Sequence, residues 1–138
     1  MEITGMAHVM LTVCSFEKCR TFYGRIFEAL GLKTVIDVDG MYYCVGGRTA
    51  VGIQQGGAGE GDRFVQGRVG LHHLCLRARS RADVDKMHEL VKEMGALVVH
   101  PPEEAPWAPG YYSVLFEDPD GIRLEMNHVP GKGLLEEG

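Results

Sequence analysis

The sequence predicts an α+β fold of two βαβββ modules, each composed of a strand, a helix and three further strands. The pairs His8/His73 and Ser15/Ser80 are each separated by 65 residues. Each serine begins a stretch of helical periodicity, and each helical stretch precedes short runs of β-forming residues. A constant spacing across a strand, a cap and a helix indicates two copies of one unit. Both copies place a histidine at the same point of their first strand.

The first module is expected over residues 5–55, with its first strand at residues 8–13. Ser15 is the expected N-cap of a helix that carries an apolar stripe and ends at Gly31. Turn residues then separate three expected strands, at residues 33–38, 41–45 and 49–54.

The second module is expected over residues 70–128 and repeats this plan from a strand at 73–78. Ser80, followed by an acidic residue three positions later, resembles a capping box and begins a helix that ends at Gly95. The proline-rich stretch 101–110 is predicted to be a loop. The remaining strands are expected at residues 97–99, 111–116 and 122–128.

Residues 56–69 are rich in glycine and are interpreted as a flexible linker between the modules, and residues 129–138 as a frayed tail. The glycine spacing is not that of a dinucleotide-binding loop, and no strand-to-helix junction surrounds it. A chain of 138 residues has room for one domain in which two modules share a core.

Charge and composition argue against several classes of function. The formal net charge is −5 and the 14 lysines and arginines are scattered, which is not the pattern of a nucleic-acid-binding protein. No stretch reaches the roughly 20 apolar residues of a membrane span, and the N-terminus does not have the pattern of a signal peptide. We therefore expect a cytoplasmic protein with no membrane partner. The four cysteines have no CxxC spacing and are expected to be reduced.

Side-chain alternation along the predicted strands places both repeat-related histidines on equivalent faces. His8 lies opposite the valine- and leucine-rich side of its strand, and His73 lies opposite the leucine-rich side of its own. Because the apolar sides are expected to pack against the helices, the two histidines should face a concave side of the sheet. The same alternation favours His73 over its neighbour His72.

On the last predicted strand, alternation places Glu125 on the polar face, together with Arg123. His8, His73 and Glu125 form a donor set that suits one divalent transition metal ion (Zn, Ni, Mn or Fe) and leaves coordination positions open. A buried carboxylate also requires a metal or a cationic partner, for which Arg77 and Arg123 are candidates. The alternative is two core histidines satisfied by hydrogen bonds, with Glu125 paired to Arg123.

The corresponding strand of the first module offers Gly52 or Gln54 as the counterpart of Glu125. Gln54 is a candidate fourth metal ligand if its amide points inward. The alternative is a solvated amide at the end of a strand.

Four segments of the chain resemble the vicinal oxygen chelate superfamily, which includes glyoxalase I, bleomycin-resistance proteins and extradiol dioxygenases. They cover residues 7–13, 22–32, 70–76 and 111–125, of which the last is the most specific. The resemblance implies two βαβββ modules that curl into a partly open barrel around a central metal site. It implies that His8, His73 and Glu125 are the ligands, and that the protein is a homodimer.

The resemblance also implies an enzyme, in first place a lyase or isomerase of glyoxalase type. Such an enzyme acts on a small-molecule substrate with vicinal oxygens through a metal-stabilised enolate, and Glu125, Arg77 and Arg123 are the expected catalytic residues. A second hypothesis is a metal-free protein that sequesters an aromatic small molecule, as bleomycin-resistance proteins do, with Tyr43 and Tyr111 among the stacking residues. A third is an Fe(II) dioxygenase. The fold alone does not choose among them.

Overall fold

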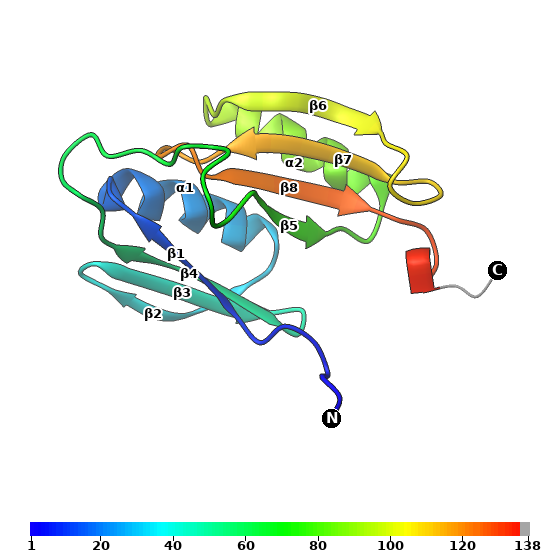
Figure 1. Cartoon of the computed structure of the whole chain (residues 1–138), viewed down its shortest axis with the longest axis horizontal. Helices are drawn as coiled ribbons and strands as arrows, with labels where there is room; N and C mark the ends of the chain where they lie inside the picture. Colours follow the sequence, from blue (N-terminus) through cyan, green and yellow to red (C-terminus); the bar gives the residue numbers. More distant parts are fainter. Residues whose placement is uncertain (136–138) are drawn as a thin grey trace. The chain divides into compact units, whose positions relative to one another are not determined.

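Two βαβββ units make up the structure, as predicted. The computed structural model of the chain describes residues 1–135, and the chain divides after Arg63 into two compact units. Each unit has its own four-stranded sheet and its own α-helix (Figure 1). Among the described residues, no helix has the length and hydropathy needed to cross a bilayer.

In the first unit, the strands are ordered β1-β4-β3-β2, with β1 parallel to β4 and the other neighbours antiparallel. The helix begins after Ser15, as predicted, although the Ser15 side chain makes no capping hydrogen bond. Beyond the helix end, Gly31 has a φ of 71°, which glycine adopts without strain. The elements are β1 (Val9–Val13), α1 (Phe16–Ala29), β2 (Lys33–Val38), β3 (Met41–Gly46) and β4 (Thr49–Gln55).

The core of the first unit lies between α1 and one face of the sheet. From the sheet, Leu11, Val51 and Ile53 are buried on this face. Because side chains alternate along a strand, Met10 and Gly52 belong to the opposite face. The helix contributes a stripe of buried residues at helical spacing: Phe16, Cys19, Phe22, Tyr23, Ile26 and Phe27.

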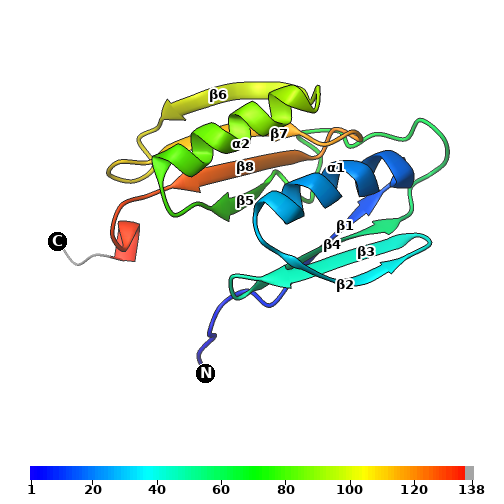
Figure 2. The same ribbon diagram turned by 180° about the vertical axis from the view of Figure 1, so that it is seen from behind.

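In the second unit, the strands are ordered β5-β8-β7-β6, with β5 parallel to β8. The helix packs against β6, β7 and β8 (Figure 2). Its predicted N-cap is confirmed, because Ser80 Oγ accepts a hydrogen bond of 3.2 Å from the Asp83 backbone N–H. The elements are β5 (Leu74–Arg77), α2 (Arg81–Glu93), β6 (Val98–Glu104), β7 (Tyr112–Glu117) and β8 (Arg123–His128).

Strand β6 is longer than predicted, because it continues through Pro101 and Pro102 to Glu104. The predicted loop at residues 101–110 is therefore wrong over its first part. Strand β6 stands at the edge of its sheet, where the outward backbone groups have no ladder partner and proline is tolerated. Register shifts on both sides of His100 accompany the two prolines.

A buried aspartate holds the turn between β7 and β8. Asp118 is only 4% exposed, and its Oδ1 accepts hydrogen bonds from the backbone N–H groups of Asp120 (2.8 Å) and Ile122 (2.9 Å). These bonds satisfy donors that would otherwise be buried without a partner. They also fix where β8 starts, and β8 carries Glu125.

The glycine-rich stretch and the tail both make defined contacts. The Gly56 N–H donates to the Val13 carbonyl at 2.9 Å, and the Ala58 N–H donates to the Asp62 carboxylate at 2.8 Å. The predicted tail at 129–138 contains a 3₁₀ turn, Gly133–Leu135. Its last three positions, 136–138, lie outside the described residues.

Candidate metal centre

The second unit brings together His73 and Glu125, two of the three predicted ligands. His73 lies immediately before β5, and the parallel register pairs Cys75 of β5 with Glu125 of β8. His73 Nε2 lies 3.0 Å from Glu125 Oε2. Glu125 is 9% exposed, so its carboxylate is largely removed from water. Alternation along the strands therefore placed this pair correctly.

Two further side chains extend this pair into a line of four. The Tyr111 hydroxyl donates a hydrogen bond to Glu125 Oε1, the oxygen that does not face His73. On the other side, His72 Nδ1 lies 2.7 Å from His73 Nδ1. The line therefore runs from His72 through His73 and Glu125 to Tyr111. We call these four residues the ligand line.

Burial of Tyr111 and Cys75, together with the nearby Glu125 carboxylate, shifts the pKa values of these two side chains. Desolvation and the hydrogen bond to Glu125 raise the pKa of Tyr111 well above its usual value. Desolvation and the negative charge of Glu125 raise the pKa of Cys75 to about 12. Both groups are therefore neutral near pH 7, and Tyr111 acts as a hydrogen-bond donor.

The two arginines that were candidate partners of Glu125 have other contacts. Arg123 Nε lies 3.6 Å from Glu117 Oε2, its cross-strand neighbour on β7. Arg77 donates to the carbonyl oxygens of Val129 and Gly131. The partners of the Glu125 carboxylate are therefore His73 and Tyr111, and the Glu125–Arg123 pair that was the alternative is not formed in the described part of the chain.

The spacing of the His73 and Glu125 donor atoms fits a shared metal ion. Two ligand atoms bound at about 2.1 Å lie about 3.0 Å apart in octahedral geometry and about 3.4 Å apart in tetrahedral geometry, and His73 Nε2 and Glu125 Oε2 are 3.0 Å apart. An imidazole nitrogen and a carboxylate oxygen are ligand types that zinc, nickel, manganese and iron accept. Within residues 1–135, no group of three or more His, Cys, Asp or Glu side chains comes together as a metal site. The pair therefore fits two coordination positions.

The third predicted ligand, His8, belongs to the first unit. It is exposed and lies immediately before β1, as His73 lies immediately before β5. Its ring contacts that of Tyr43 edge-on, with a centroid distance of 6.4 Å. The predicted equivalence of the two histidines in the repeat thus holds in the local structure.

The first sheet has glycine at the position that corresponds to Glu125. Register pairs Met10 with Gly52 in the first unit, just as it pairs Cys75 with Glu125 in the second. A Cβ atom at Gly52 would lie 2.8 Å from Met10 Sδ and 2.8 Å from a ring carbon of Tyr43. Gln54, the other candidate, is exposed and pairs with Thr12 one step further along the face.

Sequence reasoning missed the roles of His72 and Tyr111. Tyr111 has the same strand parity as Ser113 and Leu115, which pair with Asn127 and Glu125. Alternation could therefore have placed Tyr111 on the Glu125 face. For His72, alternation predicted a place opposite His73, whereas both histidines precede β5, where strand alternation does not apply, and their rings are in contact.

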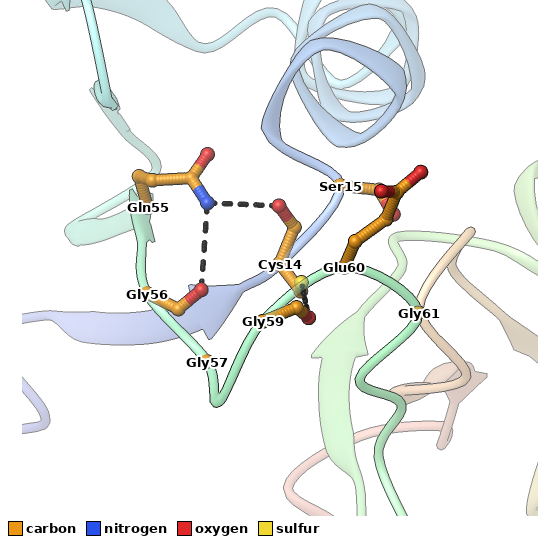
Figure 3. Close-up of a pocket in the computed structure, with 8 residues that line it drawn as sticks. All are labelled: Cys14, Ser15, Gln55, Gly56, Gly57, Gly59, Glu60 and Gly61. Atoms are coloured by element: carbon orange, nitrogen blue, oxygen red, sulfur yellow. Dashed lines mark hydrogen bonds between the residues drawn. The ribbon is translucent and has the colours of Figure 1, made fainter.

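Both described pockets lie in the first unit. One, of about 460 Å³, lies between the start of α1 and the glycine-rich loop (Figure 3). Gln55 Nε2 donates to the Cys14 carbonyl at 2.8 Å, and Cys14 Sγ donates to the Gly59 carbonyl at 2.8 Å. The other pocket, of about 730 Å³, lies along α1 and the start of β2. None of the predicted site residues lines either pocket.

Comparison with known proteins agrees with this fold and confirms the resemblance. The family model described as Glyoxalase/Bleomycin resistance protein/Dioxygenase superfamily matches residues 5–126. The uncharacterized protein YqjT of Bacillus subtilis (strain 168) is 32% identical over 124 residues, which cover 88% of this chain and 96% of YqjT.

Solved structures share the architecture as well. A crystal structure from Bacillus halodurans has a TM-score of 0.79 at 26% identity and covers 91% of this chain and 96% of its own. The lactoylglutathione lyase of Agrobacterium tumefaciens has a TM-score of 0.68 at 22% identity, over 93% of this chain and 96% of its own. At that identity the likeness is one of fold alone.

Proposed function

This chain belongs to the glyoxalase/bleomycin resistance protein/dioxygenase superfamily, and we propose that it is a divalent-metal-dependent enzyme acting on a small molecule with vicinal oxygens. The proposed reaction is that of a lyase or isomerase of glyoxalase type. The observation that carries this proposal is the 3.0 Å approach of His73 Nε2 to Oε2 of the largely buried Glu125. A buried carboxylate facing an imidazole nitrogen supplies two ligands of suitable type.

We propose His8, His73 and Glu125 as the ligands of one zinc, nickel, manganese or iron ion. When bound, such an ion acts as a Lewis acid that stabilises negative charge developing on substrate oxygens. Gln54 stays a candidate fourth ligand. A site with three protein ligands is favoured over one with four, because Gly52, at the position equivalent to Glu125, has no carboxylate.

The chain's own side chains have separate proposed roles. The Glu125 carboxyl group has one oxygen in contact with Tyr111 and the other in contact with His73. Arg123 and Arg77 are the proposed contacts for a negatively charged group of the substrate. Both arginines have contacts of their own: Arg123 Nε lies 3.6 Å from Glu117 Oε2, and Arg77 donates to two carbonyl groups, so a substrate anion would compete with these contacts.

A metal-free binding protein is the second candidate, and one observation favours it. Protein groups contact both oxygens of the Glu125 carboxylate without an ion, because Tyr111 donates a hydrogen bond to Oε1 and His73 Nε2 lies 3.0 Å from Oε2. In the first unit, Met10 and Tyr43 cover Gly52 and offer an apolar and aromatic surface. Ligand screening with aromatic compounds would follow if no metal binds.

Elemental analysis of protein purified without a metal-binding tag tests the proposal. After incubation with Zn²⁺, Ni²⁺, Mn²⁺ or Fe²⁺, we expect about one ion per chain and its loss in His73→Ala and Glu125→Gln. His100→Ala is the matched control, because the His100 ring contacts the Pro101 carbonyl on the edge strand β6. Wild-type protein that stays free of all four metals would contradict the proposal.

The proposed partners are a small-molecule substrate and a second copy of the chain. We propose a cytoplasmic homodimer; the dimer is proposed in line with the family resemblance. Light scattering on the purified protein tests the dimer, and a monomer at micromolar concentration would contradict it.

A further inference from the structure

Within the ligand line, the proposed ligands Glu125 and His73 each have one further polar neighbour. Glu125 has two carboxylate oxygens, of which Tyr111 occupies Oε1 and His73 faces Oε2. His73 has two ring nitrogens, of which Nδ1 contacts His72 and Nε2 faces Glu125. One atom of each pair is therefore occupied, and the other two atoms face each other.

Tyr111 reaches Glu125 from the neighbouring strand. It lies just before β7, and its hydroxyl crosses to the carboxylate on β8. A carboxylate oxygen accepts hydrogen bonds, so the Tyr111 hydroxyl is the donor to Oε1. A carboxylate held in this way presents a single oxygen toward His73.

His72 restricts the orientation of the His73 ring. The rings of His72 and His73 are nearly perpendicular, with centroids 5.0 Å apart and an interplanar angle of 77°. Their Nδ1 atoms are 2.7 Å apart, so one of them carries the proton that joins them. This contact restricts rotation of the His73 ring and keeps Nε2 directed at Glu125.

We infer that Tyr111 and His72 are positioning residues that hold Glu125 and His73 with one oxygen and one nitrogen facing each other. Hydrogen bonds to the outer atoms of metal ligands orient those ligands and strengthen metal binding. The effect on metal affinity rests on the proposed function. The orientation of the two side chains does not, because it is a property of the metal-free protein.

The neighbouring tyrosine provides a matched control. The Tyr112 hydroxyl also donates to a carboxylate, that of Asp85, at 2.6 Å, and the Arg81 guanidinium lies 4.0 Å above its ring. Asp85 and Arg81 belong to α2, so Tyr112 lies on the helix face of the sheet. Tyr112→Phe therefore removes an equivalent hydrogen bond next to Tyr111 without touching the ligand line.

The first measurement uses the metal-free protein. Long-range ¹H–¹⁵N spectra report the protonation and hydrogen bonding of the His73 ring nitrogens. We expect changed His73 signals in Tyr111→Phe and His72→Ala, partial recovery in His72→Asn, and wild-type signals in Tyr112→Phe. Unchanged His73 signals in both Tyr111→Phe and His72→Ala would overturn the inference.

The second measurement is titration of the same variants with Zn²⁺ alone. Tyr111→Phe and His72→Ala should bind Zn²⁺ about 10- to 100-fold more weakly than wild type, and Tyr112→Phe should bind it equally. Wild-type affinity in the first two variants, with binding lost in His73→Ala, would overturn the inference but not the proposed function. If the wild type binds no Zn²⁺, Ni²⁺, Mn²⁺ or Fe²⁺, the proposed function fails, and the spectra still decide the inference.

Discussion

Gly52 occupies in the first sheet the register position that Glu125 occupies in the second. Gly52 pairs with Met10, and Glu125 pairs with Cys75, which follows Met10 by 65 residues in the repeat. The space beside Gly52 is filled by Met10 Sδ and the Tyr43 ring. The two copies of the unit therefore differ in chemical character at this position, since one carries a carboxylate and the other an apolar surface.

Replacing Gly52 with glutamate should destabilise the protein and should not create a fourth ligand. The new Cβ would lie 2.8 Å from the Met10 and Tyr43 side chains and 2.9 Å from the Tyr42 carbonyl oxygen, which is backbone and cannot easily move. Overpacking of this kind costs about 1–3 kcal/mol, which urea unfolding would measure as a lower free energy of unfolding. Gln54→Glu, on the exposed end of the same face, is the control and should change little. Equal stability of the two variants would contradict this prediction.

The proximity of His73 and Glu125 could be predicted from sequence, because the repeat spacing and the strand parity are both read directly from the order of the residues. A constant spacing identified His73, and alternation placed Glu125 on the same face, as the register confirms. The choice between Gly52 and Gln54 could not be made, because it depends on which residue of β1 each one faces. Which side chains pair with each other could not be predicted from sequence. Arg123 lies beside Glu117, and the contacts of Glu125 are with His73 and Tyr111.

Removing the carboxylate of Asp118 should destabilise the second unit. Asp118→Ala leaves the buried backbone N–H groups of Asp120 and Ile122 without their acceptor. A buried unsatisfied donor costs about 1–3 kcal/mol, so we expect a loss of about 2 kcal/mol or more in the free energy of unfolding. Urea unfolding measures this. Asp118→Asn keeps an oxygen acceptor and should recover part of the loss, and a wild-type midpoint in Asp118→Ala would contradict the prediction.

Removing the N-cap of α2 should lower the free energy of unfolding by less than Asp118→Ala does. Ser80 Oγ accepts the hydrogen bond of the Asp83 N–H at 3.2 Å, at the start of a helix that buries Val84, Met87 and Val91. Loss of a serine N-cap typically costs about 1 kcal/mol. We therefore expect Ser80→Ala to lower the free energy of unfolding by about that amount in thermal or urea unfolding. Ser80→Thr keeps the hydroxyl and should stay close to wild type; equal losses in both variants would show that the hydrogen bond is not the cause.

The order of helices and strands could be predicted from sequence, but not every residue at which a strand ends. Helix starts and stops follow local signals, such as Ser80 and Gly31, and both were confirmed. The predicted end of β6 was wrong. Proline generally disfavours a strand but is tolerated in an edge strand, and the sequence does not reveal that β6 is at the edge of its sheet.

A surface ion pair in the first unit should make stability depend on pH at the acid end. Arg20 donates two hydrogen bonds to Asp37, at 2.8 and 2.7 Å, and its guanidinium lies 3.7 Å above the Tyr42 ring. The hydrogen bond from Arg20 lowers the pKa of Asp37 below its ordinary value. A carboxylate with a lowered pKa in the folded state stabilises the fold above its unfolded pKa, and this contribution is lost as the pH falls through the folded pKa. The free energy of unfolding of wild type should therefore exceed that of Asp37→Asn at pH 7, and the difference should shrink below about pH 4.

The control for this pair is Asp39→Asn, in the turn between β2 and β3, where asparagine is equally suited. Its difference from wild type should not follow the pH dependence of Asp37→Asn. Salt provides an independent check, because an exposed pair is screened as ionic strength rises. A difference between wild type and Asp37→Asn that is the same at pH 3 and pH 7 would show that the pair makes no ionic contribution, and Arg20 would then act only by packing on Tyr42.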